Sequence, residues 1–216
     1  MSNRLLAAVA VAASLVAASA AQASTVFASM VDVSGAGAGI GWDAELGDAP
    51  STARTNPANM LGAPDSVPGR EGGFYSLNGG VAVFGFGTNF FGDANIFEVT
   101  FSCSGSGERC SNHPESVDVY AFAGAYNPFD GAFGLGDLLS RGFSFVGNLG
   151  NGTAQRGGSI TVGGPFSFLA LVDNSSTPDG FDIDAISVSA VPVPASALFL
   201  LAGLGGLGFL RSRRKA

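Results

Sequence analysis

The central part of this chain, residues 24–190, is interrupted every few positions by glycine, proline, asparagine, aspartate or serine, and no amphipathic helix of three turns can be traced in it. Glycine makes up 33 of the 216 residues, while the helix-forming residues glutamate, lysine and glutamine are scarce. Sixteen of the 18 phenylalanines fall in this part and supply volume for a hydrophobic core. These features predict an all-β domain.

Alternating apolar and polar residues mark one strand clearly, with Phe97, Val99 and Phe101 on one face and Glu98 and Thr100 on the other. The other predicted strands are Thr25–Val33, Val81–Phe86, Val117–Phe122, Phe143–Val146, Ser159–Val162, Phe166–Val172 and Ile183–Val188. Residues 56–65 and 127–136 are predicted to be loops, because proline, glycine and asparagine dominate them. Eight or nine short strands favour a two-sheet sandwich of the jelly-roll kind.

The N-terminal segment has the pattern of a secretory signal peptide. Arg4 precedes an apolar run from Leu5 to Ala18, and Ala21-Gln22-Ala23 closes the segment with small residues at its first and third positions. A signal peptidase accepts such residues, so we expect cleavage after Ala23 and a mature domain over residues 24–190.

The C-terminal segment, residues 191–216, combines three features in a fixed order. It begins with the short motif Val191-Pro192-Val193-Pro194-Ala195, continues with an apolar run over residues 195–210, and ends with the basic residues of 211–216, which are Arg211, Arg213, Arg214 and Lys215. As a helix the run would rise about 24 Å, slightly short of the ~30 Å hydrocarbon core of a bilayer. The basic side chains that follow the run can snorkel to the membrane surface and so lengthen the span, and their charge favours the cytoplasmic side for that end of the helix. We therefore expect a transmembrane helix with the preceding domain outside the cytoplasm.

This three-part tail resembles the PEP-CTERM class of bacterial sorting signals in its VPxPA variant, with residues 191–195 as the recognition motif. The resemblance implies an exosortase-type membrane protease as a partner and cleavage near Pro192 to Ala195. It also implies a precursor anchored in the inner membrane and a product at the cell surface or in an exopolysaccharide or biofilm matrix.

The charge of the mature domain excludes some partners. All 17 acidic residues lie within residues 24–190, against five arginines and no lysine, which gives a formal charge of −12. Binding to nucleic acid requires a cationic face that neutralises phosphates, so nucleic acid is not expected as a partner. Divalent cations would be attracted to such a surface.

Cys103 and Cys110 are the only cysteines, and a six-residue Gly/Ser-containing loop separates them. An oxidising compartment and this spacing predict a structural disulfide. The single histidine, His113, does not complete a metal shell with them, and no Gly-x-Ser-x-Gly elbow accompanies it. The sequence thus predicts a protein that is not an enzyme, with a glycosidase built on two carboxylates as a weaker alternative.

Two acidic motifs are candidate sites. Asp179, Asp182 and Asp184 lie close together in Pro178–Ala185, and Asp65 ends Leu61–Asp65. Carboxylates this close repel one another, and Ca²⁺ would relieve the repulsion, with Asp65 joining if the first and last strands pair. The alternative is that Asp179 and Asp182 cap a turn while Asp184 is solvated. No cofactor is certain, and Ca²⁺ is a candidate.

The same motifs resemble many PEP-CTERM ectodomains, in which Leu-Gly-x-Pro-Asp, a Ser-Leu-Gly-x-Gly-Gly segment and a Phe-Asp-Leu-Asp-Ala-Val strand follow one another. The corresponding segments here are Leu61–Asp65, Ser76–Gly80 and Phe181–Ile186. Those relatives look like discoidin or galactose-binding-type β-sandwiches, whose end loops often hold calcium and sometimes sugar. In this chain Val119–Gly124 departs from the pattern.

The leading hypothesis is therefore an exported, non-enzymatic surface or exopolysaccharide-matrix-associated protein. The alternative is a secreted, lectin-like carbohydrate-binding module, with calcium-dependent binding as one version of it. Such a module would stack sugars on exposed aromatic rings, for which the candidates are Trp42, Tyr75, Tyr120 and Tyr126.

Overall fold

The computed structural model describes residues 24–35, 55–65, 73–99, 114–151, 158–176 and 180–190. In these ranges, no helix is long and apolar enough to cross a membrane. The predicted leader of residues 1–23 and the predicted sorting tail of residues 191–216 lie outside the described residues.

The described chain is almost entirely β-structure. Its elements, in chain order, are β1 (Thr25–Phe27), β2 (Met30–Ser34), the 3₁₀ helix η1 (Pro57–Met60), β3 (Tyr75–Ser76), β4 (Val81–Glu98), β5 (Ser116–Phe122), α2 (Leu135–Ser140), β6 (Ser144–Gly150), β7 (Gly158–Asp173) and β8 (Asp182–Ala190). All strand pairs in these ranges are antiparallel, in the order β1-β8-β4-β7-β5-β6, with β2 paired to β4 and β3 paired to β8. The prediction of an all-β fold is confirmed.

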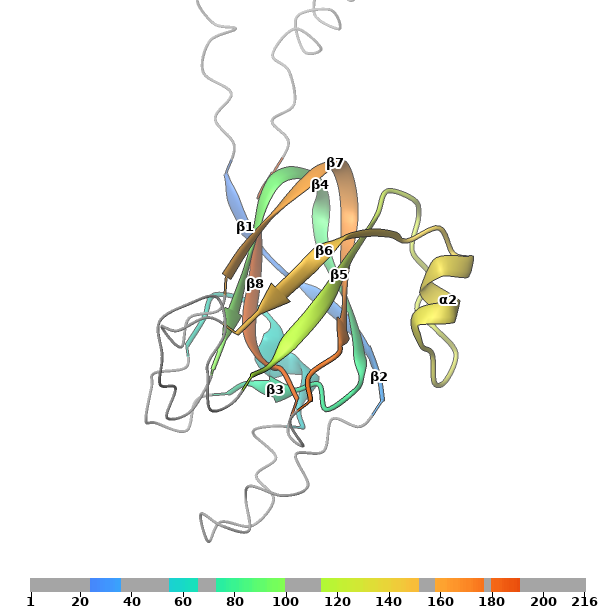
Figure 1. The fold of residues 1–216 in the computed structure, drawn as a ribbon. Helices are drawn as coiled ribbons and strands as arrows, with labels where there is room; N and C mark the ends of the chain where they lie inside the picture. The colour runs from blue at the N-terminus through green and yellow to red at the C-terminus, as the bar shows by residue number, and fades with distance from the viewer. Residues whose placement is uncertain are drawn as a thin grey trace, which may run out of the picture. The chain divides into compact units, whose positions relative to one another are not determined.

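Two long strands, β4 and β7, give the sheet its two-layered, sandwich-like form (Figure 1). They pair with each other over most of their lengths. Residues 81–85 of β4 also pair with β2, whereas residues 90–98 pair with β8. Residues 168–173 of β7 likewise pair with β5. Both strands arch over between their two halves, so each contributes to both layers.

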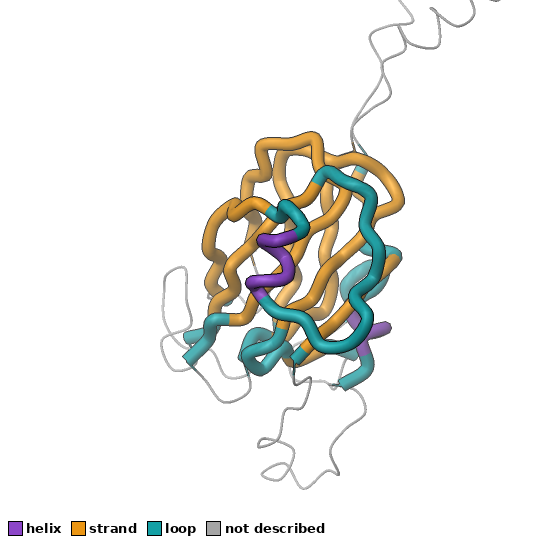
Figure 2. Tube along the Cα trace, turned by 90° about the vertical axis from the view of Figure 1, so that its right-hand side faces the viewer, coloured by secondary structure: helices purple, strands orange, loops and turns teal. Residues whose placement is uncertain are grey.

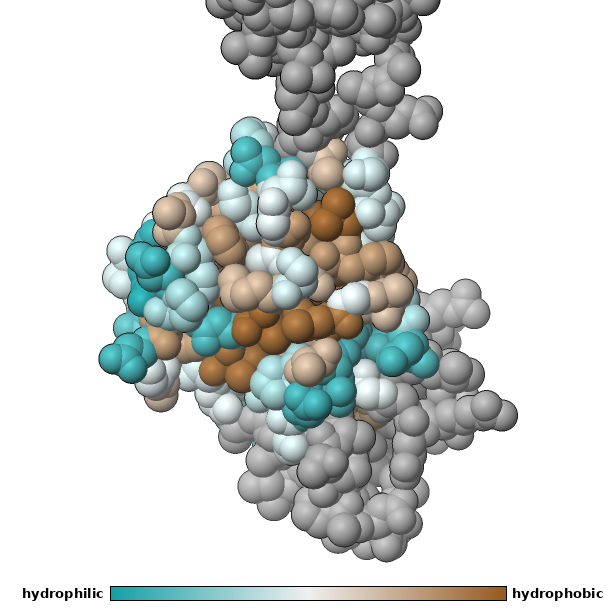
Figure 3. All heavy atoms as spheres, turned by 180° about the vertical axis from the view of Figure 1, so that it is seen from behind, coloured by the Kyte–Doolittle hydropathy of each residue, from teal (hydrophilic) through white to brown (hydrophobic). Residues whose placement is uncertain are grey.

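The main hydrophobic core lies between these layers. It draws buried side chains from both halves of β4, such as Phe84 and Ile96, and from β5, β7 and β8. Burying large apolar side chains from every layer is the main source of stability in a domain of this kind. Some apolar surface still reaches solvent, and Figure 3 shows a band of apolar side chains on the face turned away from the viewer of Figure 1.

A second cluster lies on the outer side of the sheet. The odd-numbered residues Val81 and Val83 of β4 face away from the main core, because side chains alternate along a strand. Residues 123–143, which include α2, cover them, and Figure 2 shows this loop and helix lying outside the strands. Leu138 of α2 is completely buried there. The segment is therefore a packed part of the domain.

The predicted strand list needs several corrections. Val81–Phe86 and the start of Phe97–Phe101 belong to the single strand β4, and Ser159–Val162 and Phe166–Val172 both belong to β7. Thr25–Val33 is divided into β1 and β2. The predicted strands inside β4 and β7 are too short because the glycines and the proline that separate them lie at bulges. Pairing is interrupted at each bulge and resumes beyond it, so the strand continues.

The predicted loops also contain ordered structure. η1 lies within the predicted loop of residues 56–65, where the Asn56 side chain accepts a hydrogen bond from the backbone N–H of Ala58. α2 overlaps the predicted loop of residues 127–136, and Asp137 accepts a hydrogen bond from the backbone N–H of Gly134 at its start. Short helices of one or two turns, held by such caps, give too little periodicity to be recognised in a sequence.

Candidate functional site

The structure brings together two of the acidic residues that the sequence singled out, through the backbone of one and the side chain of the other. The backbone N–H of Asp65 donates a 3.3 Å hydrogen bond to Oδ1 of Asp184 across 119 residues of chain. Asp65 is exposed, whereas Asp184 is only 4% exposed. The interpretation in which Asp184 is solvated is therefore wrong: its carboxylate is buried and fastens the segment after η1 to β8.

Asp182 is buried as well, with 2% of its surface exposed. Its Oδ1 accepts a hydrogen bond from the hydroxyl of Ser76, which is its register partner on β3. The pairing of β4 with β8 shifts between Phe97 and Glu98, where β8 carries one residue more than β4. This bulge reorients β8 at Asp184 and explains why simple alternation does not describe the region.

These contacts do not by themselves form a calcium site. Across the described ranges, no three His, Cys, Asp or Glu side chains converge closely enough to hold a metal ion. Asp179, which the sequence placed in the same group, lies outside the described residues. Calcium binding at Asp65, Asp179, Asp182 and Asp184 stays a prediction.

Other predicted site residues also fall outside the described part of the chain. These are Cys103 and Cys110 of the predicted disulfide, the motif Val191–Ala195, and the basic residues Arg211, Arg213, Arg214 and Lys215.

Asp173, at the end of β7, is an organising residue that the sequence analysis missed. Its Oδ2 accepts hydrogen bonds from the backbone N–H groups of Gly79 at 2.7 Å and Phe181 at 3.4 Å, and its Oδ1 accepts one from Ser175 at 2.8 Å. The carboxylate thereby ties the turn before β4 to the segment before β8. The sequence signal was the Asp-Asn-Ser run directly after an apolar strand, a pattern typical of side-chain-to-backbone turns.

Tyr126 anchors residues 123–143, here called the outer segment, on β2. Its hydroxyl donates a 2.6 Å hydrogen bond to Oδ2 of Asp32, and the Arg141 guanidinium lies 5.8 Å from its ring centroid. Burial is the largest effect that raises the pKa of Tyr126 well above its usual value. The hydrogen bond to Asp32 and the charge of Asp32 raise the pKa further, while Arg141 opposes them. Tyr126 therefore stays protonated and neutral at ordinary pH.

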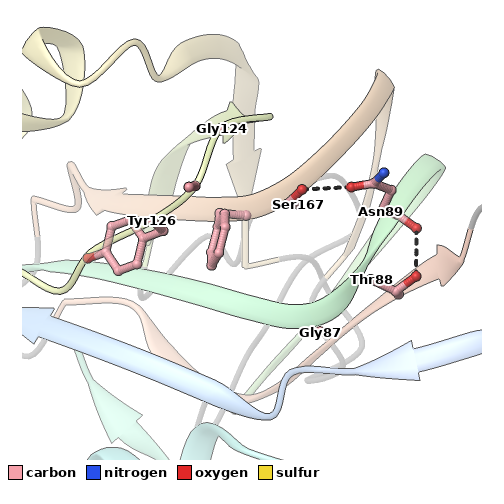
Figure 4. Close-up of a pocket in the computed structure, with 8 residues that line it drawn as sticks. Gly87, Thr88, Asn89, Gly124, Tyr126 and Ser167 are labelled. Carbon is pink, nitrogen blue, oxygen red and sulfur yellow. Dashed lines mark hydrogen bonds between the residues drawn. The ribbon is translucent and has the colours of Figure 1, made fainter.

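Only one of the proposed stacking aromatics lines a described hollow. Tyr75 and Tyr120 are buried, with 4% and 6% of their surface exposed, and Trp42 lies outside the described residues. Tyr126 is half-buried and borders a surface hollow of about 450 Å³. The lining residues are Gly87, Thr88, Asn89, Gly124, Ala125, Tyr126, Ser167 and Phe168 (Figure 4).

The fold and these contacts define an acidic, antiparallel β-protein with buried carboxylates that fasten its loops. No protein-family model matches the chain, and no curated protein matches it either. Its function is therefore argued from its own residues.

Proposed function

We propose that this protein is an exported, non-enzymatic surface or exopolysaccharide-matrix-associated protein that is sorted through its C-terminal segment. The observation that carries the proposal is the order of features in residues 191–216: the motif Val191–Ala195, an apolar run of membrane-spanning length, and four cations. This order resembles the VPxPA variant of the PEP-CTERM signal, and an exosortase-type protease would read it.

The remaining sequence supports export. The leader pattern of residues 1–23 makes signal peptidase the first processing partner. The formal charge of −12 on residues 24–190 suits a protein that stays soluble outside the membrane and repels other polyanions. A jelly-roll-like sandwich of the discoidin or galactose-binding type is the finer fold that we propose for the all-β domain.

The test is intact mass combined with fractionation of the protein from its own host. Supernatant, polysaccharide matrix, outer envelope and inner membrane are compared. The proposal expects a product that lacks residues 1–23 and everything beyond about Val191, recovered outside the cell. A protein found in the inner membrane with Arg211–Ala216 still attached would overturn the sorting proposal and indicate a simple anchor.

A second candidate function is saccharide binding, with or without calcium. The observation that favours it is the half-buried Tyr126 at the edge of a hollow that also presents Asn89 and Ser167. An aromatic ring combined with amide and hydroxyl groups is the usual chemistry of a sugar-binding surface.

A further inference from the structure

The hollow is built by an irregularity in the pairing of β4 with β7. Gly85 pairs with Phe168 and Phe90 pairs with Phe166, so four residues of β4, 86–89, stand opposite the single residue Ser167 of β7. Gly87 has a φ of +66°, a backbone conformation that other residues rarely adopt. The bulge pushes residues 88 and 89 out of the ladder and gives their side chains a direction that a regular strand would not allow.

One side of the hollow is polar. The hydroxyl of Ser167 donates a 2.7 Å hydrogen bond to Oδ1 of Asn89, and the hydroxyl of Thr88 lies 3.4 Å from the backbone oxygen of Asn89. An asparagine amide also carries two N–H donors, and serine and threonine hydroxyls both donate and accept. Several donors and acceptors thus meet at one place, fixed by contacts between two strands.

The other side is aromatic. The rings of Tyr126 and Phe168 have centroids 5.0 Å apart, and both side chains are half-buried. The neighbouring residues Gly124 and Ala125 complete this side of the lining. In Figure 4, Tyr126 and the Asn89–Ser167 pair lie at opposite sides of the hollow.

None of the lining residues carries a charge at neutral pH, and the chain as a whole is acidic, with a formal net charge of −7. The lining itself therefore offers no cation to an anionic ligand and no carboxylate to a cation. The Arg141 guanidinium, 5.8 Å from the Tyr126 ring centroid, is outside the lining and contacts Phe129 and Asn127. The volume of about 450 Å³ lies within the ~300–1,000 Å³ range usual for small-molecule sites.

We propose that this hollow binds a neutral pyranose unit of a polysaccharide, with the C–H face of the sugar ring against Tyr126 and its hydroxyls hydrogen-bonded to Asn89, Thr88 and Ser167. A pyranose has this division between an apolar face and a hydroxyl-bearing rim. The inference rests on the second candidate function above and specifies its site and its ligand class.

The experiment is saturation-transfer NMR on the full chain, purified in a zwitterionic detergent that contains no sugar. The probes are the methyl pyranosides of glucose, galactose and mannose, with methyl glucuronide as the anionic counterpart and phenol as an aromatic without sugar hydroxyls. For a ligand of this size we expect a Kd of about 1 mM for at least one neutral pyranoside, so titration to ~20 mM covers the range. The transfer should be strongest at the ring C–H protons.

The variants Asn89→Ala and Ser167→Ala test the site. Each removes one set of hydrogen bonds at an accessible position, and each should weaken binding about 3- to 10-fold. The matched controls are Asn95→Ala and Ser159→Ala, which remove exposed polar side chains from the same two strands away from the hollow. Far-UV circular dichroism should show that all four variants keep their β-structure.

Several outcomes would overturn the inference: no transfer to any neutral pyranoside, equal losses in the site variants and the controls, or binding of phenol or the glucuronide alone. Fractionation separates this failure from failure of the sorting proposal. Asn89→Ala should leave processing and location unchanged, because the hollow is not part of the tail. Sugar binding by a protein retained in the inner membrane would overturn sorting alone.

Discussion

The hydroxyl of Tyr126 and Oδ2 of Asp32 form a 2.6 Å hydrogen bond although 94 residues separate them in the chain. The same Asp32 oxygen accepts a 2.9 Å hydrogen bond from the backbone N–H of Phe129. Arg141 stacks its guanidinium 3.5 Å above the centroid of the Phe129 ring and donates to the backbone oxygen of Asn127. The Asp32 carboxylate thus fixes residues 123–143, and with them the aromatic side of the hollow, to β2, while Arg141 braces this segment from within.

Replacing Asp32 with alanine should therefore destabilise the protein. The change removes two hydrogen bonds to a charged acceptor, and we expect a loss of about 2–4 kcal/mol in the free energy of unfolding. Urea denaturation followed by circular dichroism measures it. The control is Asp130→Ala, an exposed carboxylate in the same segment, with an expected effect below about 0.5 kcal/mol. Equal effects would show that the Asp32 contacts do not hold the segment.

Stability should fall at alkaline pH through Tyr126. Its pKa is raised in the folded protein, mainly by burial, while an unfolded tyrosine titrates near its ordinary value of about 10. Above about pH 10 the unfolded chain releases this proton and the folded chain keeps it, so the free energy of unfolding decreases as the pH rises. Burial, with the charge of Asp118, raises the pKa of Tyr120 in the same direction.

Tyr126→Phe removes one of these titrating groups. Urea midpoints between pH 8 and 11 should fall less steeply in the variant than in the unchanged protein, and Tyr120 should account for part of the remaining slope. Tyr126→Phe should also be less stable at pH 8, because the hydrogen bond to Asp32 is lost. Identical slopes in the two proteins would contradict the assignment.

The local sequence pattern is sufficient to locate strands that contain no glycine or proline. Val117–Phe122 and Ile183–Val188 were predicted within one or two residues of the ends of β5 and β8. This pattern does not predict the full lengths of β4 and β7, because the glycines and the proline inside them resemble strand ends. Gly87 and the run of residues 163–165 are bulges, at which pairing is interrupted and then resumes. Only the partner strand shows this, and a single sequence does not reveal the partner.

Burial was the feature of the site that could not be predicted. The sequence identified Asp182 and Asp184 as neighbours but gave no sign that both would be buried. Glu98, predicted on the face opposite Phe97 and Val99, is only 1% exposed. It is two residues from the core residue Ile96, and such residues share one face of a strand. Charged residues are seldom buried, so the residue types alone do not indicate the burial of these three side chains. Packing against segments distant in the sequence buries all three residues.

Asp173 should be among the most sensitive carboxylates in the domain. Asp173→Ala removes the acceptor for three backbone N–H groups at a residue that is 8% exposed, and we expect a loss of about 3 kcal/mol in the free energy of unfolding. Asp137→Ala is the control, because this exposed residue accepts one such bond at the start of α2 and should cost about 1 kcal/mol. A smaller effect at Asp173 than at Asp137 would refute its role in joining the two segments.

Gly180→Ala tests the same junction sterically. A Cβ at this position would lie 2.2 Å from Oδ2 of Asp173 and 2.5 Å from the backbone nitrogen of Asn78, and Gly180 has a φ of +72°. Gly79→Ala is a matched control, since Gly79 has a φ of +75° but open space around its Cβ position. Both variants should lose stability through backbone strain, and Gly180→Ala should lose clearly more.

Calcium, if it binds as the sequence predicts, should stabilise the protein through Asp184. At about 5 mM Ca²⁺ and an affinity typical of extracellular modules, the free energy of unfolding should rise by about 1–2 kcal/mol. Asp184→Asn should abolish this response, whereas Asp93→Asn, an exposed carboxylate of β4, should keep it. Mg²⁺ at the same concentration controls for ionic strength. A protein that Ca²⁺ does not stabilise would contradict calcium binding at Asp184.

Replacing Pro192 and Pro194 with alanine should block processing without affecting the domain. Both residues belong to the motif Val191–Ala195, which follows the last residue of β8, Ala190. If a protease reads the prolines, the double variant should accumulate in the inner membrane as a precursor that keeps its basic end. Immunoblotting of fractions and intact mass measure the shift, and an unchanged urea midpoint shows that the domain still folds. The control is Ser196→Ala, one residue beyond the motif, which should be processed normally. Normal processing of the double variant would mean that the tail is an anchor whose prolines are not recognised.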